Sequence, residues 1–210
     1  MTEFNWKAGD EVLVVKTGVA NVASMLAGLR RAGATPVLVE TGERLLEAPR
    51  VVVPGVGAFG TAMKALHDMK LADVLVERIT KRLPTMTVCL GLQILGHASE
   101  ESPGVEGLGV VDASATRFTG DIRVPQLGWN YVQADNDTRF LRDGYVYFAN
   151  SYRWTDVRGE WLCARGEYAG SFVGAVESGG VLACQFHPEL SGQYGHELMV
   201  RWLENGGASC

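Results

Sequence analysis

Hydrophobic residues in the first ninety positions alternate between short unbroken runs and longer stretches with helical spacing. The short runs cover residues 11–15, 36–40, 51–53 and 85–88, and each predicts a buried strand. The longer stretches predict helices over 21–31, ending at Gly33, over 60–82, ending before Pro84, and near 90–97. Strands that alternate with helices indicate βαβ units and a mainly parallel sheet.

The pattern changes after residue 107, where strand-like stretches follow one another with turn residues between them. These stretches cover residues 110–118, 128–133, 144–150, 161–168, 171–176 and 181–186, and a closing helix is predicted over 191–204. We see no linker between the two halves. We therefore predict one α/β domain over residues 1–210, with an open, mainly parallel sheet flanked by helices and an antiparallel extension.

A cysteine stands where the fourth predicted strand meets the next helix. In TVCLGLQIL, at residues 87–95, the strand ends at Cys89 and Gly91 follows two residues later. Such a turn resembles a nucleophile elbow, because it pushes the side chain above the sheet while the helix N-terminus favours the thiolate. The backbone N–H of Leu90 would point toward an oxyanion. The alternative, preferred if nothing else matched, is a buried cysteine acting as a small hydrophobe.

A histidine and a glutamate follow the last predicted strand. In ACQFHPE, at residues 183–189, the strand ends at His187, Pro188 halts it and Glu189 comes next. An imidazole can take the thiol proton, and a carboxylate two residues later can fold back and hold the imidazole tautomer. Both strand ends open on the carboxyl edge of a parallel sheet, where α/β proteins bind ligands. The alternative is a surface histidine, with Glu189 capping the final helix.

Together these segments resemble the class-I, triad-type glutamine amidotransferases. CLGLQ around Cys89 matches the family's C-x-G-x-Q elbow, and QFHPE at 185–189 matches its C-terminal motif. Further segments resemble the branch that forms the glutaminase subunit of imidazole glycerol phosphate synthase, namely KTGVANVASM at 16–25, PGVGAF at 54–59, VPQLGWN at 124–130 and YFANSYRW at 147–154. Departures from the usual pattern of the branch stand at Ala20, Thr87, Asn150 and Leu190.

The resemblance implies a reaction, a partner and a set of residues. Glutamine is hydrolysed to glutamate and ammonia without a metal or organic cofactor, by Cys89 as nucleophile, His187 as base and Glu189 as its orienter. The ammonia passes to a (β/α)8-barrel cyclase subunit in a heterodimer, which forms imidazole glycerol phosphate and an aminoimidazole carboxamide ribotide in histidine biosynthesis. The implied glutamine and oxyanion contacts are Gly55, Val56, Gly57, Leu90, Gln93, Ser151 and Tyr152, and the implied cyclase contacts are Trp129 and Asn130.

Composition and charge limit the classes of partner and the cellular location that we expect. A net charge of -5 without a basic run argues against nucleic acid. We find no apolar stretch near the roughly 18 residues that span a bilayer, and the first residues lack the basic and apolar regions of a signal peptide. The cysteines at 89, 163, 184 and 210 show no metal-ligand spacing. We therefore expect a cytoplasmic protein with reduced thiols and no membrane contact.

Three other functions fit parts of this pattern. A paralogue with the same fold could supply ammonia to a different synthase, such as one that amidates a sugar nucleotide. A stand-alone cysteine hydrolase could share the elbow, but it would not need the QFHPE and GWN segments. A catalytically inactive interaction subunit is disfavoured because Cys89, His187 and Glu189 are all present.

Overall fold

The computed structural model describes residues 6–16, 22–55 and 57–207, so Asn21, Val56 and Cys210 lie outside the described residues. Its central sheet has nine strands in the order β2-β1-β3-β4-β11-β10-β9-β6-β7. The first five are parallel neighbours: β2 (Thr35–Val39), β1 (Glu11–Val15), β3 (Val51–Gly55), β4 (Thr85–Cys89) and β11 (Val181–Cys184). The other four are antiparallel: β10 (Ser171–Ser178), β9 (Leu162–Glu167), β6 (Gln126–Ala134) and β7 (Gly144–Asn150). The predicted α/β sheet with an antiparallel extension is confirmed.

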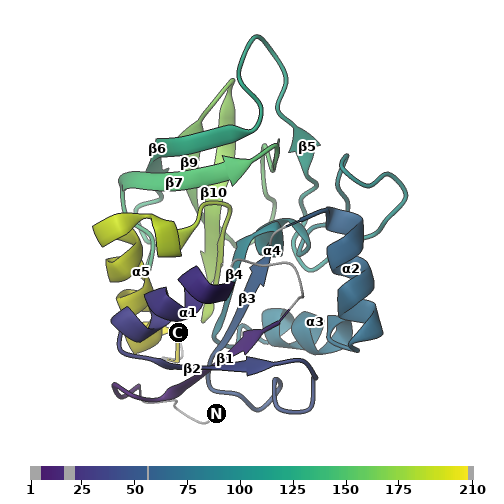
Figure 1. The fold of residues 1–210 in the computed structure, drawn as a ribbon. Helices are drawn as coiled ribbons and strands as arrows, with labels where there is room; N and C mark the ends of the chain where they lie inside the picture. The colour runs from purple at the N-terminus through teal and green to yellow at the C-terminus, as the bar shows by residue number, and fades with distance from the viewer. Residues whose placement is uncertain (1–5, 17–21, 56, 208–210) are drawn as a thin grey trace.

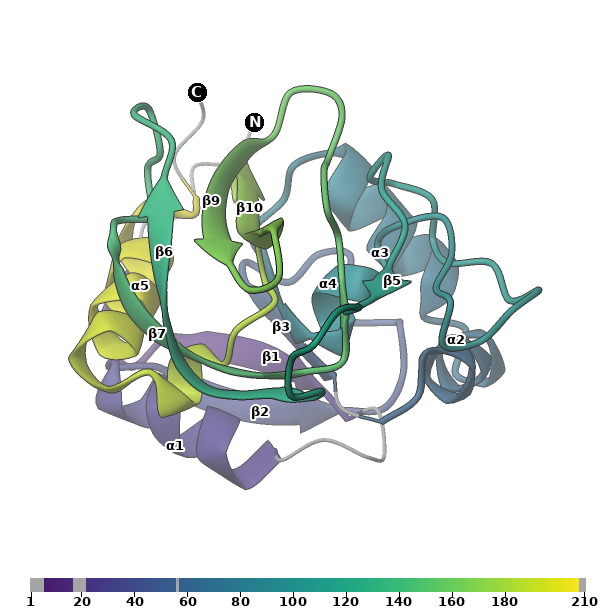
Figure 2. The same ribbon diagram turned by 90° about the horizontal axis from the view of Figure 1, so that it is seen from above.

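Helices cover both faces of the parallel strands (Figures 1 and 2). On one face, α1 (Val22–Arg31) and α5 (Gly192–Asn205) pack in one cluster with Val12 and Val14. On the other, α2 (Phe59–Asp68) and α3 (Ala72–Thr80) pack with Leu13 and Val15. Successive side chains of a strand point to opposite faces, so β1 needs apolar residues at consecutive positions to fill both layers.

A third cluster supports the segment that follows β4. It joins Leu92 and Leu95 to Trp154, Val173 and Val176, which lie on or near the antiparallel extension. The short elements of this region are α4 (Leu90–Gln93), β5 (Thr116–Arg117), β8 (Tyr152–Arg153) and the 3-10 helix η1 (Pro188–Leu190). In the ranges that the structure describes, no helix has the length and apolar character needed to cross a bilayer.

The helix predicted over 60–82 is two helices, which corrects the sequence analysis. The first ends at Asp68, Lys70 adopts a left-handed backbone with φ of 54°, and the second begins at Ala72. The Leu71 N–H donates to the Leu66 carbonyl at 2.8 Å, as in a Schellman motif, and the Leu71 side chain is buried. Because Leu71 keeps the apolar pattern continuous, the pattern alone does not show this break.

Two further predictions about regular structure need correction. The helix expected near 90–97 ends at Gln93, because the carbonyls of Ile94, Leu95 and Gly96 accept hydrogen bonds from residues 108–111 instead of continuing the helix. The strand expected over 110–118 is regular only at Thr116–Arg117. Its side chains do alternate between buried and exposed from Val111 to Ala115, but its backbone bonds to loops as well as to β8.

Candidate active site

Cys89 occupies a strained turn at the carboxyl end of β4. Its φ of 56° and ψ of -110° place it outside the backbone regions that residues other than glycine usually adopt, at a cost of about 1–3 kcal/mol. The surrounding glycines make the turn possible. A Cβ on Gly91 would lie 2.6 Å from the Val53 carbonyl oxygen, and one on Gly55 would lie 2.5 Å from the Gly91 nitrogen. The glycines of the elbow and of β3 are therefore required by the close approach of two backbones.

His187 and Glu189 form a buried pair just beyond β11. His187 Nδ1 lies 2.9 Å from Glu189 Oε1, and the two side chains are 8% and 4% exposed. The main chain of His187 is also fixed, since its N–H donates to the Tyr147 carbonyl and its carbonyl accepts from the Ser191 hydroxyl. Burial lowers the pKa of His187, but interactions with Cys89 and Glu189 outweigh burial and raise the pKa to about 10. An imidazolium held next to a sulfur atom suits a thiolate partner.

The sheet explains why these distant residues meet. Strands β4 and β11 are parallel neighbours, with Cys184 opposite Val88, so Cys89 and His187 both emerge at the carboxyl edge. On the other side of β4, Gly55 of β3 is opposite Cys89. The order of strands thus brings the three sequence-predicted catalytic residues together, and it places Gly55 beside Cys89.

An open pocket of about 430 Å³ lies in front of Cys89 and His187. Its volume is in the range of small-molecule sites. Of the predicted substrate contacts, Gly57, Leu90, Gln93, Ser151 and Tyr152 line it. Gly55 lies behind the pocket at the end of β3, and Val56 lies outside the described residues. Glu189 also lies behind the wall, where it contacts His187 and not the pocket.

The pocket has further lining residues that sequence reasoning missed. These are Glu101, Leu127, Tyr147, Ala149, Asn150 and Leu190. Glu101 Oε2 accepts the Phe59 N–H at 2.7 Å, and Ser102 Oγ accepts the Gly60 N–H at 3.0 Å, so a remote loop caps the start of α2. Ala58, the local cap position, makes no side-chain bond. No signal in the sequence around Glu101 indicates a contact with a helix that starts 42 positions earlier.

An exposed apolar stripe runs along β6 and β7 from the mouth of this pocket. It consists of the exposed residues Leu127, Trp129, Tyr131, Tyr145 and the adjacent Leu190, together with the half-buried Tyr147. Trp129 is opposite Tyr147 and Tyr131 is opposite Tyr145, and each pair packs edge to face. The structure therefore places Trp129, which was predicted to contact a partner, on a surface of the kind that marks a protein interface.

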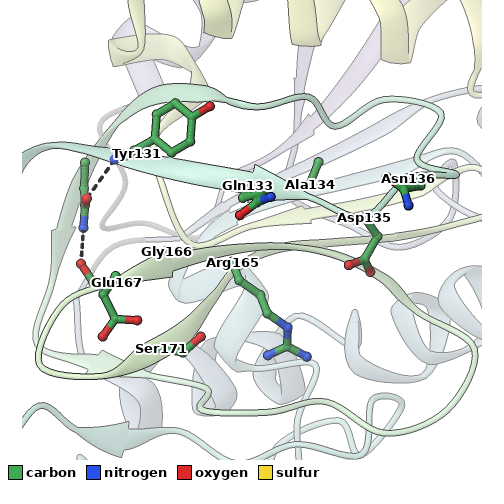
Figure 3. Close-up of a pocket in the computed structure, with 10 residues that line it drawn as sticks. Tyr131, Gln133, Ala134, Asp135, Asn136, Arg165, Gly166, Glu167 and Ser171 are labelled. Atoms are coloured by element: carbon green, nitrogen blue, oxygen red, sulfur yellow. Dashed lines mark hydrogen bonds between the residues drawn. The ribbon is translucent and has the colours of Figure 1, made fainter.

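Asn130, the other predicted partner contact, has a local role in the structure. Its Nδ2 donates to the Glu167 carbonyl at 2.9 Å and its Oδ1 accepts the Tyr131 N–H, as the dashed lines beside Tyr131 and Glu167 in Figure 3 show. It lines a second hollow, of about 570 Å³, between β6 and β9. That hollow is larger than the Cys89 pocket, but polar side chains such as Asp135 and Arg165 line it, and no cysteine or histidine does. Of these two hollows, the smaller one is therefore the candidate for nucleophilic chemistry.

In the described ranges, no group of three or more histidine, cysteine, aspartate or glutamate side chains is arranged to hold a metal ion. The other two described cysteines, Cys163 and Cys184, are buried free thiols, and burial raises the pKa of each. For Cys163 the value is about 11. Both thiols are thus poor nucleophiles at neutral pH.

A cysteine at a strand-to-helix turn and a buried His–Glu pair thus lie at one edge of this sheet, and comparison with known proteins shows the family of the chain. Residues 13–204 match the family described as glutamine amidotransferase class-I. A solved crystal structure of a glutamine amidotransferase superimposes with a TM-score of 0.75 at 22% identity, covering 94% of this chain and 99% of that one. The chain belongs to the class-I glutamine amidotransferase family.

Sequence relatives show to which branch of the family the chain belongs. Imidazole glycerol phosphate synthase subunit HisH from Salmonella typhimurium is 36% identical, and the HisH subunit from Oceanobacillus iheyensis is 31% identical, each over 92% of this chain and 98% of the relative. Imidazole glycerol phosphate synthase hisHF from Arabidopsis thaliana is 39% identical over 91% of this chain, which spans only 34% of that protein. Within the family, the chain falls among the HisH subunits.

Proposed function

We propose that this chain hydrolyses glutamine to glutamate and ammonia as the glutaminase subunit of an imidazole glycerol phosphate synthase. One observation carries the catalytic part of the proposal. His187 lies between Glu189 and Cys89 at the carboxyl edge of the sheet, with its pKa raised by both of them. The names of the HisH relatives support the choice of pathway over that of a paralogue serving another synthase.

The chemistry follows from this geometry. The Cys89 sulfur attacks the side-chain amide carbon of glutamine, and the negative charge moves to the amide oxygen, which the Leu90 N–H can stabilise. A single donor of this kind contributes roughly 2.7–4 kcal/mol in comparable sites. The C–N bond then breaks, His187 gives its proton to the departing ammonia, and a thioester remains. Water attacks the thioester with His187 as base, which releases glutamate and restores the thiol.

The pocket supports glutamine as the substrate. Its lining includes Cys89 and the Glu101 carboxylate, which can pair with the α-ammonium group of an amino acid. Gln93, Ser151 and Tyr152 also line it. A carboxylate together with neutral amide groups suits a substrate with a charged end and an uncharged amide end.

The apolar stripe supports a protein partner at the mouth of the pocket. A cyclase subunit that covers Leu127, Trp129 and Leu190 would close the pocket toward solvent and receive the ammonia. The Arabidopsis thaliana relative, named hisHF, is about three times as long as the matched region, which is consistent with a chain that also carries a partner unit. We further propose that the assembly is a cytoplasmic heterodimer, and that Asn130 contributes by holding β6 against the end of β9.

The proposal is tested by measuring glutamate release by the chain alone, with a (β/α)8-barrel cyclase subunit, and with cyclase plus its ribotide ligand. We expect a low rate alone and the highest rate in the third mixture, because a partner that binds one state of a two-state site better shifts the site toward that state. Trp129→Ala should reduce the activation while Cys89 still reacts with a thiol probe. Equal rates in all three mixtures would contradict the coupling to a cyclase, and no glutamate in any mixture would contradict the glutaminase assignment.

A further inference from the structure

Gln185 is a buried polar residue that the reaction above does not use. It lies directly after β11, its side chain has no exposed surface, and it does not line the pocket. Its backbone N–H donates to the Gly174 carbonyl at 2.8 Å, which continues the pairing with β10 and fixes where the side chain starts. A fully buried amide requires hydrogen-bond partners, since its N–H and C=O groups lose their bonds to water on folding.

The partners of Gln185 are the nucleophile and a predicted substrate contact. Gln185 Nε2 lies 3.8 Å from the Cys89 sulfur, and Gln185 Oε1 lies 3.0 Å from Gln93 Nε2. Gln93 Nε2 also donates to the Tyr152 carbonyl oxygen at 3.1 Å. One amide therefore bridges the reacting atom and the wall of the glutamine pocket.

One backbone carbonyl fixes the donor and the acceptor in each hydrogen bond of this series. The Tyr152 oxygen can only accept, so Gln93 must turn its NH2 group toward it. The second N–H of that group also donates, so Gln185 must present its oxygen to Gln93. The NH2 group of Gln185 is then left facing the sulfur. The orientation of both amides thus follows from their partners, without a choice between alternative rotations.

We propose that Gln185 is a positioning residue, which donates a hydrogen bond to the Cys89 thiolate and holds Gln93 so that the Gln93 side-chain oxygen faces the substrate. The first role follows because a donor to sulfur stabilises the charged form. The second follows because both Gln93 N–H groups are engaged, which leaves the oxygen as the only free polar atom of a side chain that lines the pocket. This inference rests on the proposed function only for the identity of the substrate.

The test is the pH dependence of Cys89 alkylation by iodoacetamide, followed by mass spectrometry, together with kcat and KM for glutamine in the assembled complex. The charged groups near Cys89 are His187, backed by Glu189, and Glu101, which lines the same pocket, and they are the same in all variants. In Gln185→Met, the alkylation midpoint should move up by about one pH unit, because the variant loses a donor that stabilises the thiolate over the thiol, and this hydrogen bond is long. KM for glutamine should rise and kcat/KM should fall about tenfold or more.

Two further variants keep the test decisive. Gln185→Glu places a carboxylate beside the sulfur, so its midpoint should lie higher than that of Gln185→Met. Gln126→Met is the matched control, because Gln126 is a buried glutamine whose amide atoms make no hydrogen bond within the described residues. Its alkylation profile should equal that of the wild type. Far-ultraviolet circular dichroism should show that each variant is folded.

The outcomes separate this inference from the proposed function. An alkylation midpoint that is the same in wild type, Gln185→Met and Gln185→Glu, all of them folded, would overturn the role of Gln185 even if the wild type hydrolyses glutamine. Midpoints in the expected order support its role at the thiol even if the wild type releases no glutamate, a result that would contradict the proposed function alone. An unchanged KM for glutamine in an active complex of Gln185→Met would overturn the second role, the one toward Gln93.

Discussion

Replacing Glu189 with glutamine separates the charge of the orienting group from its shape. The carboxylate lies 2.9 Å from His187 Nδ1, and both side chains are almost fully buried, so water screens their interaction little. The amide oxygen of glutamine can still accept from Nδ1–H, but without the charge. The amide can also rotate and offer its NH2 group, which would favour the wrong tautomer of the imidazole. Both effects weaken the imidazolium that forms during the reaction.

The expected loss in Glu189→Gln follows from the strength of that bond. A hydrogen bond to a charged group is worth about 1.5–3 kcal/mol, so kcat should fall about 10- to 100-fold. His187→Ala should lose more, because it removes the base itself. Glutamate release by the complex at saturating glutamine is the assay. Glu177→Gln is a control, since Glu177 is another buried carboxylate and it accepts three backbone N–H groups far from Cys89. A Glu189→Gln enzyme as inactive as Cys89→Ala, or as active as wild type, would refute this reasoning.

Three other predictions concern the thiols, the pH dependence and the core. Cys89→Ala should abolish glutamate release by the complex, whereas Cys163→Ala should retain most of it; the reverse would contradict the assignment of the nucleophile. Because the pKa of His187 is about 10 when folded and near 6.5 when unfolded, its stabilising contribution is complete below about pH 6.5 and is lost as pH rises toward 10. Urea titrations of wild type and His187→Gln should therefore differ most at low pH; a difference that grows with pH would contradict this. Arg78→Met should destabilise the chain by about 3 kcal/mol in urea, since the buried guanidinium donates to four backbone carbonyls between residues 45 and 84; unchanged stability would show that these acceptors find other partners.

The parallel strands and the elbow were predictable because their signals are local. Val51–Gly55 and Thr85–Cys89 are short, buried runs rich in apolar residues that end in glycine or cysteine, and each is followed by a helix in the sequence. A strand buried on both faces is mostly apolar, because both of its faces pack against other layers of the protein. The positions of Cys89, His187 and Glu189 at one edge followed from the rule that parallel strands point the same way.

The parts that sequence reasoning missed depend on contacts between distant segments. The break at Lys70 lies in an uninterrupted apolar pattern, and the end of α4 is set by carbonyls that bond to a loop more than ten residues later. Glu101 reaches the pocket only because its loop caps α2. Gln185 was visible within QFHPE, but its role depends on Gln93 and on the Tyr152 carbonyl, which lie on separate elements.

The nucleophile strand β4 and the strand before the base, β11, are neighbours in the sheet, and yet the whole antiparallel extension lies between them in the sequence. The chain leaves the parallel sheet after Cys89, builds β5 to β10, and returns to the next position beside β4. The distance between nucleophile and base is therefore held by a ladder of main-chain bonds that does not depend on side chains of the extension. Substitutions on the outer face of β6 and β7 can change which partner the stripe fits while the catalytic spacing is preserved. The same fold can therefore retain one ammonia-producing site while the partner subunit that receives the ammonia changes.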